Sequence, residues 1–348
     1  MQLWLVVTGL AALLAAAIHR YLIQPLLRSP LKTIPLAHPL CGVTHLYFQY
    51  LAKQGRELNA LHAAHKRYGP IVGTAPNEVS VISLEGLRQI YTSCTKTDFY
   101  HVFANFNTPN MVSMLDHKSH SAQKKILSGI YSKSYLQHSE DVARISKIVI
   151  CARLLPLLEH LVGQGRSANV YRLMQFVGID FQTAFQFGVE RSTRLVEYHG
   201  HEGVHYSTKD VSVPYDTNDP RDHDLLPEDE ILEMCKATLS SQHKDESNTT
   251  DPIVFEKLYS SLKDQDSLGK DSSNDHDENT ILRTASELRD HIIAAQETTA
   301  ITLTYTLYHL SQRPDLQSAL RHELSTLAPG VHPSPPDLDS PPLLHAVL

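Results

Sequence analysis

The sequence predicts a mainly α-helical protein with a minor β-sheet near its N-terminus. Hydrophobic side chains recur at helical spacing over 55–68 and over most of 119–197, and the pattern turns strongly helical again from Glu287. Only two short runs, Ile71–Ala75 and Val79–Ile82, are rich in β-prone residues, and a Pro-Asn turn separates them. We therefore expect one hairpin in an otherwise helical fold.

The first residues predict a membrane anchor over 1–27. Leu3–Ile18 is an uncharged run of 16 residues, and the apolar residues that follow can extend it towards the ~20 residues of a membrane-spanning helix. The basic residues follow this run and none precedes it, which favours a signal anchor with a cytosolic body over a cleaved signal peptide. Four prolines in and around 28–40 then predict a stiff, non-helical hinge.

Breaking and capping residues predict the first elements of the body. The helix over 55–68 should stop at Gly69-Pro70, directly before the hairpin. Ser83 is the expected N-cap of a helix over 84–92, because a serine hydroxyl can accept a hydrogen bond from a backbone N–H of the first turn.

Two polar segments separate the later helices. The ranges 198–224 and 240–280 are rich in Asp, Ser, Asn and Thr and predict acidic, solvated loops. Between them, Pro227–Leu239 predicts an amphipathic helix with acidic residues near its N-terminal end. A break at Gly163 is expected within the helical region that precedes them.

The composition argues against several classes of protein. A chain with 31 Lys and Arg against 38 Asp and Glu is an unsuitable nucleic-acid binder. Its four cysteines are too scattered for a zinc knuckle or a disulfide framework. His199, His201 and His205 lie in a polar loop that lacks a pattern of acidic residues able to orient metal-bound histidines, so we expect no metal ligation by them. Hydrolase and dinucleotide-binding motifs are absent from the sequence.

The chemically most informative segment is Ile292–Leu310. Its 19 residues carry one charge, Glu297, and apolar side chains on every face, which predicts a helix buried nearly all round. A carboxylate there is costly unless it is hydrogen-bonded or serves a cavity, and Thr298 and Thr299 add hydroxyl groups beside it. Two interpretations stay open: a proton-transferring acid, or a structural carboxylate whose neighbouring threonines hydrogen-bond to their own helix.

The segment Ala294-Ala295-Gln296-Glu297-Thr298-Thr299 resembles the oxygen-activating motif of the cytochrome P450 monooxygenases, Ala/Gly-Gly-x-Asp/Glu-Thr-Thr/Ser. The order and spacing of further segments support the resemblance, which reaches from the first residue to the last. It implies an incomplete cytochrome P450 fold over 41–348, the N-terminal two-thirds of that domain, preceded by a transmembrane helix. The supporting segments are the anchor and hinge, Tyr68-Gly69-Pro70-Ile71-Val72, Pro76-Asn77-Glu78-Val79, Leu310-Ser311-Gln312-Arg313-Pro314, the final Leu343–Leu348 and, for fungal members, Tyr131–Leu136.

The resemblance implies roles for single residues. Glu297 and Thr298 match the acid–alcohol pair that supplies protons for oxygen activation, and Ala294 and Ala295 match the small residues beside it, with Ala295 in place of the usual glycine. His120 and Lys124 stand where the family's Trp-x-x-x-Arg motif contacts a haem propionate. A solvated basic face is the alternative role for Lys124.

The family's haem-binding cysteine loop, Phe-x-x-Gly-x-Arg-x-Cys-x-Gly, has no counterpart among the four cysteines, so no residue of this sequence is expected to ligate iron. The sequence stops at Leu348, about where the family's Glu-x-x-Arg motif begins. We therefore expect a truncated chain in which one apolar face of the long helix is left uncovered.

Two functions follow from these observations. The first is a haem-thiolate monooxygenase of fungal secondary metabolism, anchored in the endoplasmic reticulum membrane and represented by an incomplete chain. It would oxidise a small hydrophobic substrate with NADPH electrons delivered by a flavoprotein reductase. The second is a non-catalytic remnant, unable to bind haem by thiolate, that at most binds a hydrophobic ligand or partner at the membrane.

Overall fold

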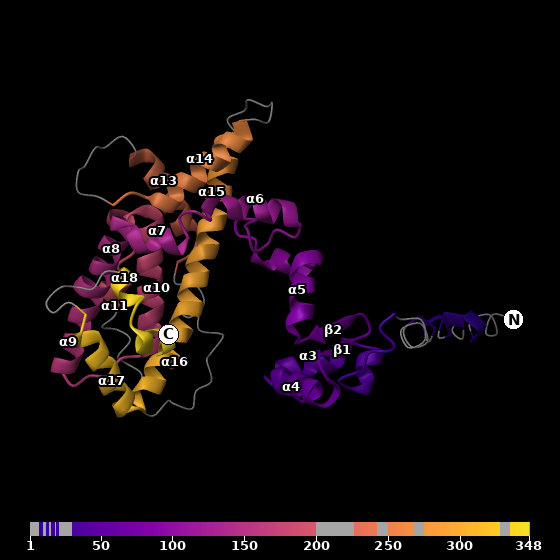
Figure 1. Ribbon diagram of the computed structural model, residues 1–348. Helices are drawn as coiled ribbons and strands as arrows, with labels where there is room; N and C mark the ends of the chain where they lie inside the picture. Colours follow the sequence, from indigo (N-terminus) through magenta and orange to yellow (C-terminus); the bar gives the residue numbers. More distant parts are fainter. Residues whose placement is uncertain are drawn as a thin grey trace. The chain divides into compact units, whose positions relative to one another are not determined.

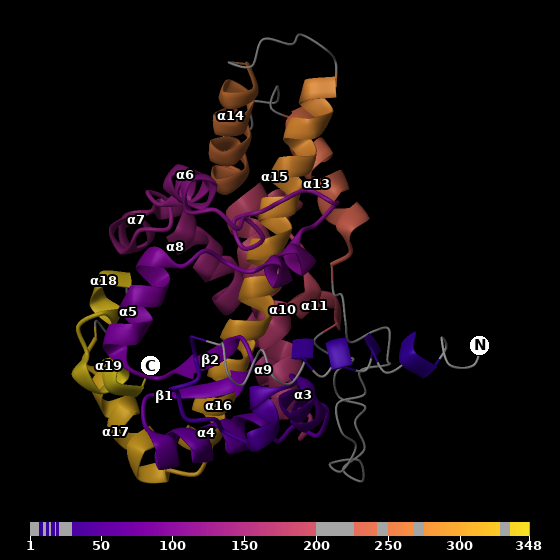
Figure 2. The same cartoon turned by 90° about the vertical axis from the view of Figure 1, so that its right-hand side faces the viewer.

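A computed structural model describes residues 30–199, 226–241, 250–267, 275–327 and 335–347, with short stretches between 7 and 20. These residues are mainly helical and carry one antiparallel two-stranded sheet, as predicted (Figures 1 and 2). They form two compact units, Met1–Thr95 and Lys96–Leu348.

Most of the predicted anchor, 1–27, lies outside the described residues, as does nearly all of the predicted loop 198–224. Among the residues that are described, no helix is long and apolar enough to cross a membrane.

The first unit follows the sequence signals closely. Its elements are η2 (Pro39–Gly42), α3 (Leu46–Lys53), α4 (Glu57–Tyr68), β1 (Ile71–Ala75), β2 (Glu78–Val81) and α5 (Leu84–Ser93). α4 ends because Gly69 adopts a φ of 100°, which residues with a side chain rarely reach. Ser83 caps α5 as predicted: its hydroxyl accepts a hydrogen bond from the N–H of Gly86 at 3.1 Å.

The proline-rich segment predicted as a hinge is held against the sheet over its described part. The N–H of Ala37 donates to the carbonyl of Gly73 at 3.0 Å, and the N–H of Gly73 donates to the carbonyl of Pro35 at 2.9 Å. A Cβ on Gly73 would lie 2.8 Å from Cδ2 of Leu36, so the end of this flexible side chain would have to shift. β1 thus supplies hydrogen-bond partners to this segment that the sequence pattern does not reveal, and the role of 28–40 as a hinge stays a prediction.

The second unit contains the remaining helices, drawn from magenta to yellow in Figure 1. They are η3 (Asp98–Phe103), α6 (His117–Leu127), α7 (Lys133–His138), α8 (Glu140–Ser146), η4 (Lys147–Leu154), α9 (Leu155–Gly163), α10 (Val170–Phe187), η5 (Val189–Arg191), α11 (Leu195–His199), α13 (Glu228–Ser241), α14 (Ile253–Ser267), α15 (Asp275–Ala294), η7 (Ala295–Thr299), α16 (Ala300–Ser311), α17 (Pro314–Ser325), α18 (Pro335–Leu338) and α19 (Pro342–Val347).

One predicted loop is wrong. The range 240–280 contains α14 and the beginning of α15. Val254, Phe255, Leu258 and Leu262 are all completely buried and lie at helical spacing on one face of α14. This apolar stripe decides the structure, because burying it outweighs the polar composition of the surrounding residues.

The core of the second unit is built around α10. This helix runs beside α15 and α16 in both ribbon views and also packs on α14 and α11 (Figures 1 and 2). Ile179 and Phe187 of α10 are completely buried, together with Leu288 of α15. α10 is therefore the element against which the candidate site is positioned.

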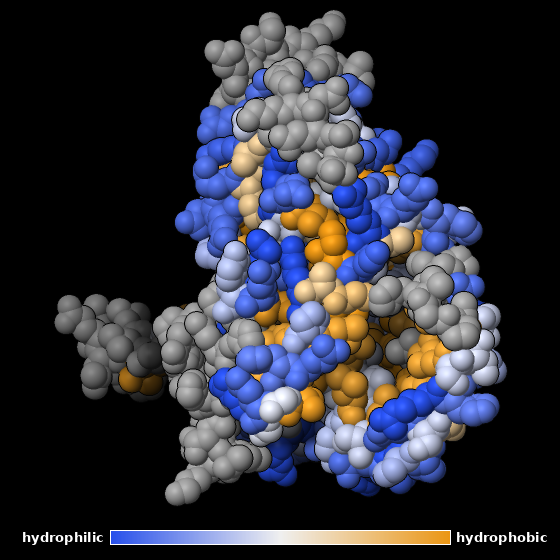
Figure 3. All heavy atoms as spheres, turned by 90° about the vertical axis from the view of Figure 1, so that its left-hand side faces the viewer, coloured by the Kyte–Doolittle hydropathy of each residue, from blue (hydrophilic) through white to orange (hydrophobic). Residues whose placement is uncertain are grey.

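The segment Ile292–Leu310 is not buried nearly all round, as its sequence suggested. On α16 the exposed fractions reach 44% for Ile301, 63% for Tyr305 and 59% for Tyr308. α16 packs on α10 with one side, and apolar residues on its other side are exposed in the described part of the chain. Figure 3 shows one face of the molecule, on which hydrophobic side chains gather around a hollow.

Candidate functional site

The candidate site lies where the long helix formed by α15 and α16 changes its winding. α15 ends at Ala294, the five residues Ala295–Thr299 form the π-helical segment η7, and α16 begins at Ala300. Such segments occur frequently at functional sites. The helix widens although Ala295 occupies the place of the usual glycine, so a glycine at that position is not required for the distortion.

The glycine that this region needs lies on the neighbouring helix. A Cβ on Gly178 of α10 would lie 2.7 Å from the carbonyl oxygen of Ala295 and 3.6 Å from the Cα of Gln296. α10 and η7 therefore meet backbone against backbone. Gly178 was not singled out from the sequence; an isolated glycine within a strong helical pattern was the one available signal.

Glu297 faces α10 and is well supplied with hydrogen-bond donors. The Tyr171 hydroxyl donates to Oε2 at 2.6 Å, and the Gln175 side-chain amide donates to Oε1 at 3.1 Å. The Gln296 amide donates to Oε1 at 3.2 Å. Tyr171 and Gln175 lie one turn apart on α10, so one helix face presents both donors. These bonds compensate the partial burial of the carboxylate.

Thr298 is exposed, and its hydroxyl group is bonded to its own helix. It donates to the carbonyl of Ala294 at 2.7 Å; Thr302 and Thr306 repeat this bond one and two turns later, at 2.8 and 2.9 Å. Although adjacent in sequence, Glu297 and Thr298 thus have different surroundings. This arrangement matches the structural interpretation left open above, while the exposed threonine oxygen keeps its capacity to accept a hydrogen bond.

The exposed side of the long helix carries a continuous stripe of small and apolar residues around Thr298. Its members lie at helical spacing and are all exposed: Ala294, Thr298, Ile301, Tyr305 and Tyr308. Ala295 is half-buried beside this stripe. We name these five residues the α16 face.

The predicted propionate-binding residues lie on α6, which Asp116 caps through a 2.8 Å hydrogen bond from the N–H of Ser119. His120 is half-buried; burial and the nearby charges of Lys96 and Lys124 lower its pKa, so its imidazole is neutral at pH 7. Lys124 is exposed. No hydrogen bond between described residues joins either of them to η7 or α16, and their propionate role stays a prediction.

Glu287 of α15 is a carboxylate that the sequence analysis did not single out, and it links α15 to α6 and to the loop before α6. Glu287 is completely buried, and its Oε2 accepts hydrogen bonds from the N–H of Met111 at 2.8 Å and from the Gln123 amide at 3.2 Å. Its Oε1 lies 3.3 Å from Nε2 of His291, whose Nδ1 lies 3.0 Å from the Tyr131 hydroxyl. No motif marks Glu287, because its partners come from distant parts of the sequence.

Two of the four cysteines are held as thiols by burial. Burial raises the pKa of the Cys235 thiol to about 12 and also raises that of Cys41, so both are protonated at neutral pH. Cys94 and Cys151 are exposed and half-buried. Among the described residues, no group of three or more His, Cys, Asp or Glu side chains could hold a metal ion. His201 and His205 lie outside the described residues, so their predicted lack of ligation is untested.

Residues 228–348 match the family model of cytochrome P450. The chain is 26% identical over 272 residues to the cytochrome P450 monooxygenase avaI of Aspergillus versicolor, with 76% of this chain and 62% of the relative covered. It is 22% identical over 313 residues to the cytochrome P450 monooxygenase FGM1 of Gibberella zeae, with 83% and 59% covered. It is 24% identical over 321 residues to the tryprostatin B 6-hydroxylase of Neosartorya fischeri, with 84% and 54% covered.

The chain thus spans between 54% and 62% of the length of these relatives. Its mainly helical fold with one small antiparallel sheet agrees with the matches. On these grounds the chain is similar to the cytochrome P450 monooxygenases, and residues 228–348 carry the match to the family model.

Proposed function

We propose that this chain forms the oxygen-side half of the active site of a haem-dependent monooxygenase of fungal secondary metabolism that oxidises a small hydrophobic molecule. The observation that carries the proposal is the α16 face, an exposed apolar stripe with one hydroxyl group, Thr298, at the π-helical turn. The fungal monooxygenases and the hydroxylase among its relatives support this reaction class.

The α16 face fits one side of a haem. Small side chains at Ala294 and Thr298 leave room beside the helix, and the larger apolar residues that follow offer a dry contact surface. His120 and Lys124 are the candidates for binding the propionates. Cys235 and Cys41 are held protonated and do not offer a thiolate, and none of the four cysteines lies in a loop like the family's haem-binding one. When bound, haem supplies the redox chemistry of oxygen activation.

The residues of this chain would supply and control protons. Thr298 presents its hydroxyl oxygen on the exposed face, where it can orient a hydrogen-bonding ligand. Glu297 can serve that face only after it leaves Tyr171 and Gln175, which hold its carboxylate on the side of α10. Proton delivery by Glu297 therefore requires a side-chain rotation, and the strength of these two bonds sets how readily it occurs.

We also propose that the segment 1–27 anchors the protein in the endoplasmic reticulum membrane, with its body in the cytosol, where a flavoprotein reductase delivers NADPH electrons. The uncharged run Leu3–Ile18 and the basic residues Arg20, Arg28 and Lys32 after it support this orientation. Deleting 1–27 should move the protein from the carbonate-washed membrane fraction to the supernatant. If the deleted form stays in the washed membranes, the anchor proposal is wrong.

A non-catalytic remnant is the second candidate function. It is favoured by the hydrogen bonds of the site, since Glu297 has three donors and the Thr298 hydroxyl is bonded to its own helix. Such a protein would bind a hydrophobic ligand or partner through the α16 face.

One experiment distinguishes the two functions. The protein translated from the complete transcript is supplied with a reductase, NADPH and a panel of small apolar substrates, and the amount of product formed is compared with the NADPH consumed. For the monooxygenase, Glu297→Gln and Thr298→Ala should lower product formation by about 10²-fold and divert reducing equivalents to peroxide. Thr306→Ala is the control, because Thr306 makes the same kind of backbone bond two turns away. Absence of oxidation in the unmodified protein would support the remnant.

A further inference from the structure

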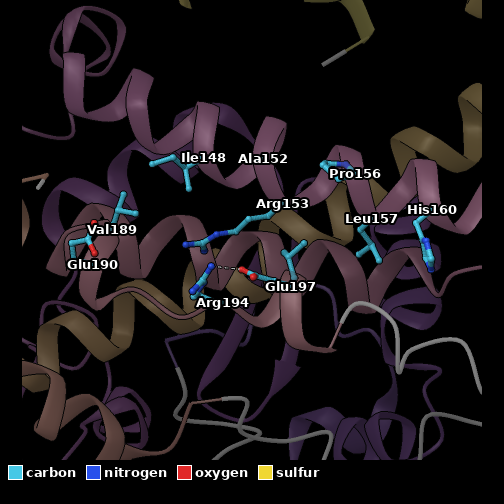
Figure 4. A pocket seen from close by; sticks show the side chains of 11 residues that line it. Ile148, Ala152, Arg153, Pro156, Leu157, His160, Val189, Glu190, Arg194 and Glu197 are labelled. Carbon is cyan, nitrogen blue, oxygen red and sulfur yellow. Dashed lines mark ion pairs between the residues drawn. The ribbon is translucent and has the colours of Figure 1, made fainter. Parts of the chain in front are cut away.

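A cleft that is separate from the candidate site opens between two helical segments of the second unit. It has a volume of about 620 Å³ and lies between η4 with the start of α9 on one side and η5 with α11 on the other (Figure 4). This volume suits a small organic ligand. Its apolar walls are formed by Ile148, Ala152, Pro156, Leu157, Val189 and Val196.

The charged group at the centre of this cleft is fixed in position. The Arg153 side chain is 7% exposed, and its Nη1 donates to the carbonyl of Thr193 at 2.9 Å and lies 3.4 Å from Oδ2 of Asp180. Asp180 is completely buried and also accepts hydrogen bonds from the Thr193 hydroxyl at 2.7 Å and from the N–H groups of Leu195 at 2.8 Å and Val196 at 3.1 Å. The negative charge of Asp180 is therefore balanced by these donors together with Nη1 of Arg153.

The opposite edge of the same guanidinium has no acceptor in the part of the chain that the structure describes. Within the described residues, Nε and Nη2 of Arg153 make no hydrogen bond. These two N–H groups point in parallel from one edge of the planar group, which is the geometry that binds both oxygens of a carboxylate. Figure 4 shows this guanidinium within the cleft, together with that of Arg194.

The local backbone explains why Arg153 reaches the cleft. η4 is π-helical, and the N–H of Leu155 bonds to the carbonyl of Ile150. Pro156 has no N–H to offer the carbonyl of Ala152, so regular α-helical bonding is interrupted one residue before Arg153. A π-helical segment beside a concave surface is a recurrent feature of binding sites.

The other charged residues at the cleft do not neutralise the Nε–Nη2 edge of Arg153. Arg194 pairs with Glu197 at 2.7 Å on the rim. Glu190 is exposed on η5, where solvent and salt screen its repulsion of an incoming anion. His160 has its own partner. Among the described residues, the buried edge of Arg153 therefore offers two donors at the centre of the cleft.

We propose that this cleft binds a small apolar molecule bearing a carboxylate, whose two oxygens accept hydrogen bonds from Nε and Nη2 of Arg153 while its hydrocarbon part lies against the apolar walls. The site is independent of the proposed monooxygenase function, since no residue of the α16 face lines it.

The test is calorimetric titration of the whole chain with octanoate, octan-1-ol and octylammonium, which share a hydrocarbon chain and differ in head group. We expect octanoate to bind one to one and the other two compounds to bind about tenfold more weakly, the effect of losing a charge-assisted hydrogen bond. Equal affinity for octanol or octylammonium, or no binding of octanoate, would overturn the proposal.

Variants locate the binding site. Ala152→Trp fills the cleft from an exposed wall position and should weaken octanoate binding by about tenfold or more, whereas Ala143→Trp, exposed on α8 away from the cleft, should leave it unchanged. Arg153→Lys keeps the charge beside Asp180 and removes the paired edge, so it should also weaken binding. If Arg153→Lys does not fold, Ala152→Trp decides alone: unchanged affinity in that variant would show that octanoate binds elsewhere.

Discussion

Gly178 of α10 lies directly against the carbonyl group of Ala295, and a single added carbon atom would come within 2.7 Å of that oxygen. At this contact the widened π-helical turn of the long helix packs against the place on α10 where Gly178 has no side chain. The same face of α10 carries Tyr171 and Gln175, which bind Glu297. α10 therefore fixes both the backbone of η7 and the position of its only charged side chain.

The first prediction concerns this backbone contact. Gly178→Ala should lower the free energy of unfolding by about 1–3 kcal/mol. The new methyl group would clash with the backbone of Ala295, which cannot move aside as a flexible side chain can. Urea unfolding followed by circular dichroism measures the change. Gly163→Ala, at the end of α9 with nothing within 4 Å of its added Cβ, is the matched control and should be neutral or stabilising. Equal stability of the two variants would contradict the close contact.

The second prediction concerns the hydrogen bond between Tyr171 and Glu297. Tyr171→Phe should destabilise the protein by about 1.5–3 kcal/mol, the usual contribution of a bond to a charged group. In Glu297→Gln the same tyrosine substitution should cost clearly less, because the charged acceptor is gone. Urea unfolding of both single variants and of the double variant gives the coupling energy. Strictly additive effects would show that the two side chains do not interact in solution.

The third prediction concerns the pH dependence of stability. Burial raises the pKa of Asp290 to about 6, against the lowering effects of His291 and Lys96. The folded state thus holds this proton more tightly than the unfolded state, whose carboxyl has the ordinary value of 3.8. The contribution of Asp290 to stability is therefore fully present below pH 4 and is lost as the pH rises to about 6.

Asp290→Asn removes this ionisation. Between pH 4 and pH 6.5, the unmodified protein should lose free energy of unfolding relative to Asp290→Asn. Above pH 6.5 the difference between the two proteins should stay constant. Asp264→Asn, on an exposed position of α14, is the control and should show no such change over the same interval. A difference that stays constant with pH for Asp290→Asn would contradict the buried position of this carboxyl group.

The fourth prediction concerns the thiols of residues 1–348. Burial raises the pKa of Cys235 to about 12 and also raises that of Cys41, and none of the four cysteines lies in a loop like the family's haem-binding one. Ferric haem added to this chain should therefore not acquire a thiolate ligand at pH 7. The reduced, CO-bound Soret band should lack the thiolate position and should be unchanged in Cys235→Ser. A thiolate-type band that disappears in one of the four Cys→Ser variants would show that a cysteine of this chain binds iron.

Local signals in the sequence predicted local structure well. Gly69 ends α4 and Ser83 caps α5, because a positive φ or a hydroxyl at a helix terminus depends on a few neighbouring residues. The hairpin β1–β2 and the helix α13 also lie within a few residues of their predicted bounds. α14 was missed because its apolar stripe is short and is embedded in a strongly polar range.

Contacts between distant residues were not predictable from the sequence. Glu297 was recognised as chemically unusual, but its partner Tyr171 lies 126 residues away and carries no motif of its own. Arg153 and Asp180 both fall in predicted helices, and only the fold brings their side chains together. Periodicity identifies which face of a helix is apolar; it does not identify the helix that covers it.

The absorption spectrum of the reduced, CO-bound protein translated from the complete transcript, read through the codon of Leu348, tests the central claim most directly. If the α16 face serves a haem monooxygenase, the protein should contain haem in stoichiometric amount and show a Soret band at the position of thiolate ligation. A transcript that stops at Leu348, or a protein that takes up no haem, would contradict the proposed monooxygenase and favour the non-catalytic alternative.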